Sequence, residues 1–140
     1  MQYADLREGI YDALCTIPAI QDSSSPPVGK VFWEWTAPAD TEKPFLEMAF
    51  IGELPSINKC AMHMQLEVLV IGDPSDILAI DPIADDVVSL LHHQPITTPA
   101  HRTIECCYVR DSRFDLWIEQ LSACGIRLKF LIVTDFWTAP

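Results

Sequence analysis

Histidine and cysteine are concentrated in the run HHQPITTPAHRTIECC at residues 92–107. These are the side chains best suited to bind a thiophilic metal. This run holds three of the four histidines and two of the five cysteines. Structural zinc sites take four ligands in a tetrahedron, usually supplied as spaced pairs such as C-x-x-C. Here the cysteines are adjacent, as are His92 and His93. The elements that carry these side chains therefore decide whether a metal can bind.

The run divides into the end of a helix, a loop bounded by Pro95 and Pro99, and a strand at residues 102–111, RTIECCYVRD. Adjacent strand residues point to opposite faces of a sheet, so Cys106 and Cys107 cannot share one metal. The histidines fall on the helix end and the Pro-bounded loop. We therefore predict no metal and no cofactor. The odd number of cysteines, at irregular spacing, further predicts free thiols.

A second cluster of ionisable side chains consists of Asp81, Asp85 and Asp86, within the segment SDILAIDPIADDVVSLLHH at residues 75–93. Its apolar residues recur with helical period. We interpret Asp81 as the N-cap of the main helix, with Pro82 as its first residue. The carboxylates would then lie near the positive end of the helix dipole, where each gains a few tenths to ~1 kcal/mol. This structural role is favoured over catalysis.

The chain carries no recognisable catalytic motif. It contains no G-x-S-x-G elbow, phosphate-binding glycine loop, H-E-x-x-H or dinucleotide fingerprint. A small enzyme or ligand-binding domain that uses the aspartate cluster, alone or together with His63, is kept as an alternative. We predict that the protein is not an enzyme.

Size and charge narrow the function further. A chain of 140 residues with 49% hydrophobic residues is predicted to form one domain, 1–140. Twenty acidic residues against nine basic ones give a net charge of -11, which predicts weak or no binding to duplex DNA. The sequence has neither the ~20 consecutive apolar residues of a membrane span nor the pattern of a signal peptide. We expect a soluble protein made in a cytoplasm, with no membrane partner.

Hydrophobic periodicity predicts two amphipathic helices and several strands. Residues 18–30 have no such period and are rich in proline and serine, which indicates a loop. Residues 111–123 fit either a short helix or an extended hairpin arm, and in both cases carry exposed aromatic side chains. The expected helices are 3–17 and 75–93, and the expected strands are 31–36, 45–51, 60–73, 102–111 and 125–137.

The order of these elements, together with three segments, resembles the tail terminator proteins of long-tailed bacteriophages, the family typified by the lambda tail terminator. The segments are LREGIYDAL near the N-terminus, the run from FLEMAFIGEL to MQLEVLVIGDPSDILAIDPIADDVVSLL, and the ending RLKFLIVTDF. The resemblance covers nearly the whole chain. It implies an α+β fold: a mixed, mainly antiparallel β-sheet with two amphipathic helices packed on one face.

The resemblance also implies a structural role in a virion. Such a protein forms a hexameric ring that caps the tail tube, ends its polymerisation and offers a joining surface to the head. Its partners would be further copies of itself, the tail tube protein and the head-tail connector, or stopper, protein. DNA would pass through the ring without specific binding. The protein would reside in the host cytoplasm during assembly and then at the head-tail junction of the virion.

Large apolar side chains outside the core pattern are the candidate contacts with neighbouring subunits or the tube. An alternative within the same class is another head-tail connector or tail-completion protein. The candidate interface residues are Ile57, Met62, Phe114, Trp117, Phe136 and Trp137.

Overall fold

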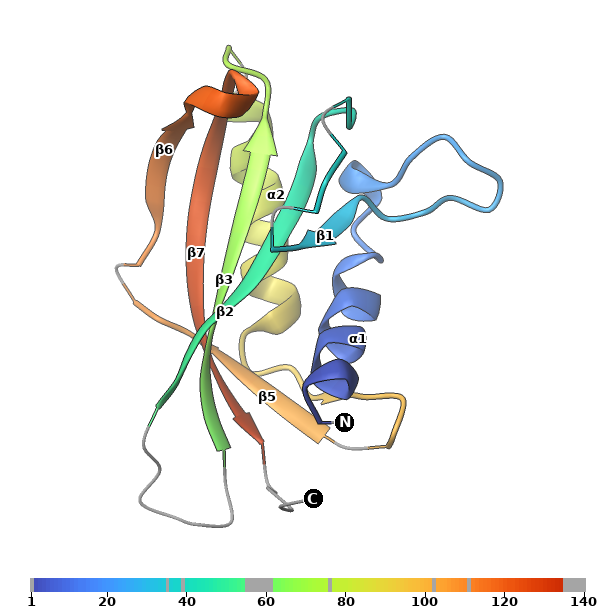
Figure 1. Cartoon of the computed structure of the whole chain (residues 1–140), viewed down its shortest axis with the longest axis vertical. Coiled ribbons are helices and arrows are strands. Elements are labelled where there is room, and N and C mark those ends of the chain that lie inside the picture. Colours follow the sequence, from blue (N-terminus) through green and yellow to red (C-terminus); the bar gives the residue numbers. More distant parts are fainter. Residues whose placement is uncertain are drawn as a thin grey trace.

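The computed structural model describes residues 2–34, 36–38, 40–54, 62–75, 77–101, 103–110 and 112–134. It has the predicted fold class: one curled sheet of seven strands, mainly antiparallel, with both helices on one face (Figure 1). The helices are α1 (Gln2–Leu14) and α2 (Ile77–Leu91), with single 3-10 turns η1 (Pro18–Ile20) and η2 (Glu119–Leu121). The strands are β1 (Val31–Trp33), β2 (Phe45–Leu54), β3 (Met62–Gly72), β4 (Ile96–Thr97), β5 (Thr103–Tyr108), β6 (Phe114–Ile118) and β7 (Ala123–Thr134).

The strands follow the order β1-β2-β3-β7-β5-β4, and β6 also pairs with β7. Only the short β1 runs parallel to its neighbour, β2. The long strand β7 pairs along one side with β3 over its whole length. Its other side is shared, because β6 pairs with residues 123–127 and β5 with residues 130–134. Residues 111–123 were predicted to form either a short helix or an extended hairpin arm. The structure has a strand, β6, followed by the 3-10 turn η2.

The face of the sheet under the helices is the main core. The inward residues of β3 and β7 alternate with outward ones, as their period of two predicts. Phe130 is completely buried and meets Tyr108 edge-on, with ring centroids 5.6 Å apart. Helix α1 contributes a stripe at helical spacing, Leu6, Ile10 and Leu14, all buried.

Helix α2 runs without a break through Pro82, where the main helical segment was predicted to start. Pro82 lies inside it, and Asp81 is a helical residue rather than an N-cap. The missing N–H of Pro82 costs one backbone hydrogen bond. A single continuous helix nevertheless keeps Ile80 on the same buried stripe as Val87 and Leu91. It also packs closely on the sheet, because a Cβ at Gly72 would lie 2.4 Å from Ile80.

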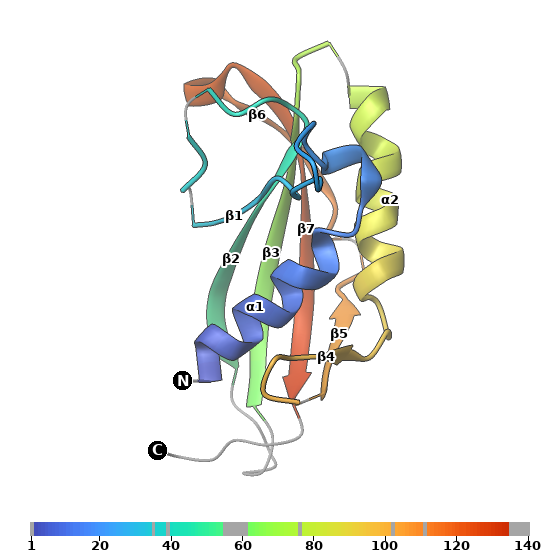
Figure 2. The ribbon, with the colours of Figure 1, turned by 90° about the vertical axis from the view of Figure 1, so that its right-hand side faces the viewer.

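The opposite face of the sheet is buried only at the end where β3 stops and α2 begins. There Phe45, Leu69 and Ile71 form a second, smaller cluster with Ile118 and Ala123. Figure 2 shows both helices on the other side of the sheet. Toward the far end, the outward side chains of the central strands are only partly buried: Gln65, Glu67, Lys129, Leu131 and Val133.

Residues 20–30 are an ordered, hairpin-like projection (Figure 1). Gln21 and Gly29 form an isolated antiparallel bridge, and the Lys30 N–H donates to the Ile20 carbonyl at 2.9 Å. The Asp22 carboxylate accepts hydrogen bonds from the backbone N–H groups of Val28 and Ser24, which lower its pKa. The prediction of a loop is confirmed.

Candidate interaction surface

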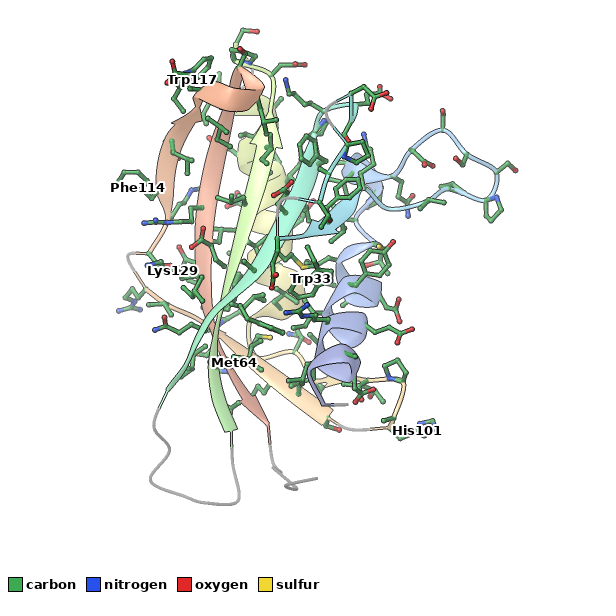
Figure 3. The ribbon with its side chains drawn as sticks, in the orientation of Figure 1. Trp33, Met64, His101, Phe114, Trp117 and Lys129 are labelled. Carbon is green, nitrogen blue, oxygen red and sulfur yellow. The ribbon has the colours of Figure 1, made fainter. Side chains whose placement is uncertain are left out.

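The most exposed aromatic side chains of the described residues lie on β6. Phe114 is 56% exposed and Trp117 is 58% exposed, as the sequence predicts for this segment. The two rings, labelled in Figure 3, are three positions apart on this edge strand: Phe114 lies opposite Arg127 and Trp117 opposite Cys124, so they project from opposite faces. Large apolar groups left in water on a monomer commonly mark a contact surface. We call Phe114 and Trp117 the aromatic edge.

A cation supports Phe114 on its face of β6. Phe114 lies opposite Arg127 in the register of β6 and β7, and the Arg127 guanidinium is 5.1 Å from the centre of its ring. The buried Arg127 Nε has no hydrogen-bond partner within the described part of the chain. This cation–π contact holds the Phe114 ring in a defined position.

The aspartate cluster predicted from the sequence is divided by the structure. Arg113, just before β6, binds Asp81 and also Asp85, the latter at 3.1 Å. Asp86 is exposed and takes no part in these two ion pairs. None of the three lies in the first turn of α2, so the predicted stabilisation by the helix dipole does not apply. Asp81 and Asp85 instead tie the aromatic edge to α2.

Three of the predicted interface residues lie outside the described part of the chain, and a fourth has a described backbone only. Ile57, Phe136 and Trp137 lie outside the described residues, and the side chain of Met62 is likewise not described. His63 of the enzyme alternative has a described backbone only. These parts of the interface hypothesis stay predictions.

Other exposed apolar residues were not anticipated from the sequence. Leu78, in the first turn of α2, is 81% exposed, and Val28 is 49% exposed on the 20–30 projection. Ile51 and Val109 are exposed by 40% and 39%. Leu78 has a recognisable signal, because it lies one position off the apolar stripe of its helix. For Val28, the only sequence feature that indicated exposure was its place in a predicted loop.

The helix face carries a groove between α1 and α2. One cavity of about 500 Å³ is lined by Gly9, Asp12, Ala13, Ser89, Leu90, Gln94, Pro95, Ile96 and Thr97. A second, of about 340 Å³, is lined by Thr16, Ile17, Pro18, Asp86, Ser89 and Leu90. Ser89 and Leu90 line both, so the two cavities are neighbouring parts of one depression. We call it the helix groove.

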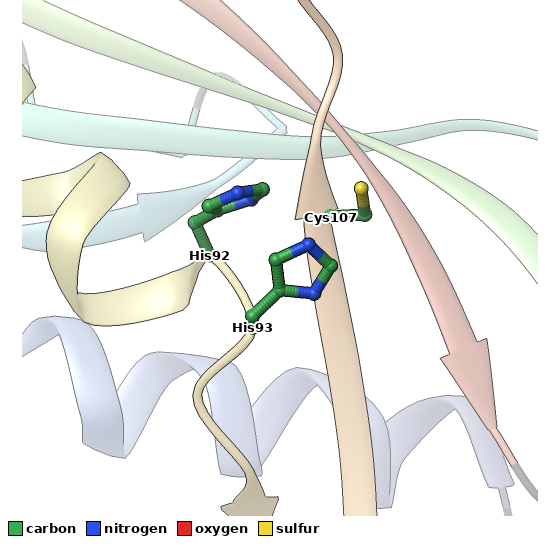
Figure 4. Close-up of side chains that lie close together, drawn as sticks. All are labelled: His92, His93 and Cys107. Carbon is green, nitrogen blue, oxygen red and sulfur yellow. The ribbon is translucent and has the colours of Figure 1, made fainter.

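The histidines and cysteines are closer together than the sequence predicts (Figure 4). The chain after α2 runs beside β5: His92 bridges to Cys106, and the His93 N–H donates to the Cys106 carbonyl at 2.8 Å. Ligand atoms of His92, His93 and Cys107 consequently lie within 4.8 Å of one another. The sequence analysis did not anticipate this approach, because pairing beside β5 is a long-range contact.

The prediction that the two cysteines face opposite ways is confirmed. Cys106 is completely buried among core side chains, whereas Cys107 is partly exposed on the other face. Burial raises the pKa of the Cys106 thiol to about 12. Cys106 is therefore a small core hydrophobe.

The hydrogen bonds of this cluster limit its use as a metal site. The His92 Nδ1 accepts the backbone N–H of Tyr108 at 2.9 Å, so neutral His92 carries its proton on Nε2. A nitrogen that binds a metal must be unprotonated. His93 is better prepared, since its Nδ1 is 2.9 Å from the Glu105 carboxylate and its Nε2 is left for a ligand. As arranged, the cluster offers two ligand atoms, from His93 and Cys107, rather than three.

None of the helices in the described part of the chain is long and apolar enough to cross a membrane.

Comparison with known proteins finds similarity at the level of fold. No family model and no curated protein sequence matches this chain. Among solved structures, a chain from the virion of a native gene transfer agent particle is similar, with a TM-score of 0.70 and 12% sequence identity. The similarity covers 95% of this chain and 96% of that one. A second solved chain is 13% identical with a TM-score of 0.57, over 99% of this chain and 96% of its own.

Proposed function

We propose that this protein is a structural component of a phage-like virion, and specifically a tail terminator. The observation that carries the proposal is the similarity of fold, from end to end, to a chain of a gene transfer agent virion. The sequence resemblance to phage tail terminators points to the same class. Neither rests on a shared motif, so the specific role requires its own test.

The aromatic edge supports an assembly role. Phe114 and Trp117 expose more than half of their surface, which is costly unless a partner covers them. The rival catalytic cluster is weakened, because two of its three carboxylates are occupied by Arg113. These features favour a protein that acts by contact rather than by chemistry.

In the proposed role, six copies form a ring on the end of the tail tube. One surface of the ring binds the tail tube protein and ends its polymerisation, and another receives the head-tail connector protein. A net charge of -11 suits a ring through which DNA passes, because an acidic lining does not hold phosphates. Assembly takes place in the host cytoplasm, and the ring stays at the head-tail junction.

A connector or tail-completion protein is the second candidate, since the same fold similarity supports any small joining component of a virion. The two candidates differ in the partner bound: a terminator binds the tube protein, and a connector component binds the head side.

The mass of the protein, measured alone and after mixing with the purified tail tube protein, tests the proposal. We expect a monomer or small oligomer alone and a ring on the tube protein, because a ring that closed too early could stop a tube before it reached its length. Binding to the connector with no binding to the tube protein would favour the second candidate.

A further inference from the structure

We propose that His93 and Cys107 form a two-ligand binding site for a soft monovalent cation such as Cu(I). The proposal goes beyond the virion role and does not depend on it. Thiolate is the ligand that selects Cu(I), and imidazole binds copper readily. An ion of this kind has a filled d shell and is stable with two ligands in line, whereas structural zinc takes four. The hydrogen bonds that make this cluster a poor zinc site leave it with the two ligands that Cu(I) needs.

The His93 ring spans two side chains on one face of β5. Glu105 and Cys107 are two positions apart on this strand, so both project from the same face. The His93 Nδ1 lies 2.9 Å from the Glu105 carboxylate, and the Cys107 sulfur lies within 4.8 Å of a ring nitrogen of His93 (Figure 4). The carboxylate holds the proton of neutral His93 on Nδ1, which leaves the Nε2 lone pair free. A histidine that binds a metal is commonly oriented by a carboxylate in this way.

The separation of the two ligands suits an ion held in line between them. Bonds from a filled-shell ion to thiolate sulfur and imidazole nitrogen are about 2.3 and 2.0 Å long, which sum to about 4.3 Å. This sum is less than the 4.8 Å that bounds the cluster, so small side-chain rotations bring both ligands to the ion. A tetrahedral ion needs further ligands, and His92 is not one of them while its Nδ1 accepts the Tyr108 N–H.

The backbone of His93 presents its side chain to β5 at a conformational cost. His93 follows the end of α2 with a φ of 55°, in the left-handed region that favours glycine. Its N–H donates to the Cys106 carbonyl at 2.8 Å, which fixes the turn beside the strand. The His92 ring packs against it, with ring centroids 4.0 Å apart. A histidine where glycine has the lower backbone cost points to a use for its imidazole.

Binding exchanges a proton for the ion and changes no oxidation state. The Cys107 thiol loses its proton to water as the sulfur–copper bond forms, and the His93 Nε2 lone pair supplies the second bond. The thiol gives up only a long contact of 3.8 Å to the Tyr108 carbonyl. The ion enters from solvent, because the His93 side chain is 57% exposed and Cys107 is partly exposed. Once bound, it fastens the end of α2 to β5.

A titration of Cu(I) against a competing chromophoric chelator, without oxygen, tests the site. We expect the wild-type chain to hold one Cu(I) more tightly than any further equivalent. His93→Gly should weaken this binding at least about tenfold, since losing even the partner of a ligand costs about 10–100-fold. Glycine suits a φ of 55°, so this variant removes the ligand and keeps the backbone. Cys107→Ser should abolish the tight equivalent.

Two matched controls separate this site from ordinary histidine or thiol binding. His101→Gly removes an exposed histidine that also has a positive φ, 61°, and lies outside the cluster. Cys15→Ser removes a partly exposed free thiol outside the cluster. Both variants should bind Cu(I) like the wild-type chain. Circular dichroism verifies that all variants fold.

X-ray absorption at the copper edge identifies the ligands directly. One sulfur and one nitrogen per ion is the expected result. Equal Cu(I) affinity of the wild-type chain and His93→Gly would overturn the site, because the thiol alone would then account for binding. Two sulfur ligands, supplied by a pair of chains, would overturn it as well.

Discussion

The two faces of the single sheet are built from the same strands and have different properties. Under the helices, the inward side chains are buried at every described position of β3 from Met64 to Val70 and of β7 from Cys124 to Ile132. On the opposite face, burial is confined to a small cluster near the start of α2. Adjacent residues can thus belong to different surfaces: Phe130 is fully buried, and Leu131 is only partly so. The comparison shows how the period of two separates residues that stabilise the fold from residues left for contacts.

The largest expected effect is on stability, and it should distinguish the two faces at neighbouring positions. Phe130→Ala deletes a completely buried ring and should lower the free energy of unfolding by ~3–5 kcal/mol. Leu131→Ala removes a partly exposed side chain and should cost about 1 kcal/mol or less. Urea denaturation of both variants measures the difference. Equal losses would mean that the outer face is as tightly packed as the core.

A second expected difference lies in the reactivity of Cys106 and Cys107. With a pKa of about 12, Cys106 holds roughly one part in ten thousand of its thiol as thiolate at pH 8, and it is also buried. Cys107 is accessible to a reagent on the other face. Alkylation followed by fragment mass spectrometry should find Cys107 modified in the folded protein and Cys106 modified only after unfolding. Comparable labelling rates would contradict the assignment of faces, and Cys107→Ser supplies the control.

The smallest expected effect concerns zinc. Because the Tyr108 N–H occupies His92 Nδ1, we expect the purified protein to bind zinc weakly and below one ion per chain. Elemental analysis with thiol titration measures this, and His93→Ala should leave the zinc content unchanged. One tightly held zinc ion per chain would show that His92 gives up its hydrogen bond to bind the metal.

Local pattern was sufficient to predict most of the fold. The stripe of α1, the alternation of β3 and β7 and the opposite orientation of Cys106 and Cys107 all follow from periods of 3.6 and 2. The continuity of α2 through Pro82 could not be predicted in this way. A proline normally marks a helix start, but burial of Ile80 against the sheet outweighs one missing hydrogen bond at Pro82.

The surface was less predictable, because its features depend on contacts between distant segments. The exposure of Phe114 and Trp117 was anticipated from their segment. Arg113 joins α2 from 28 or more residues away, which no local spacing indicates. The helix groove likewise requires the packing of α1 beside α2. The approach of His92 and His93 to Cys107 arises from a bridge beside β5.

The most direct test of the proposed role is the length of tails in particles that lack this protein, measured by electron microscopy. A tail terminator predicts tails of uncontrolled length that fail to join heads, and restoring the wild-type chain should recover tails of uniform length. Tails of normal length beside heads that lose their DNA would contradict the account and assign the protein to closure of the head.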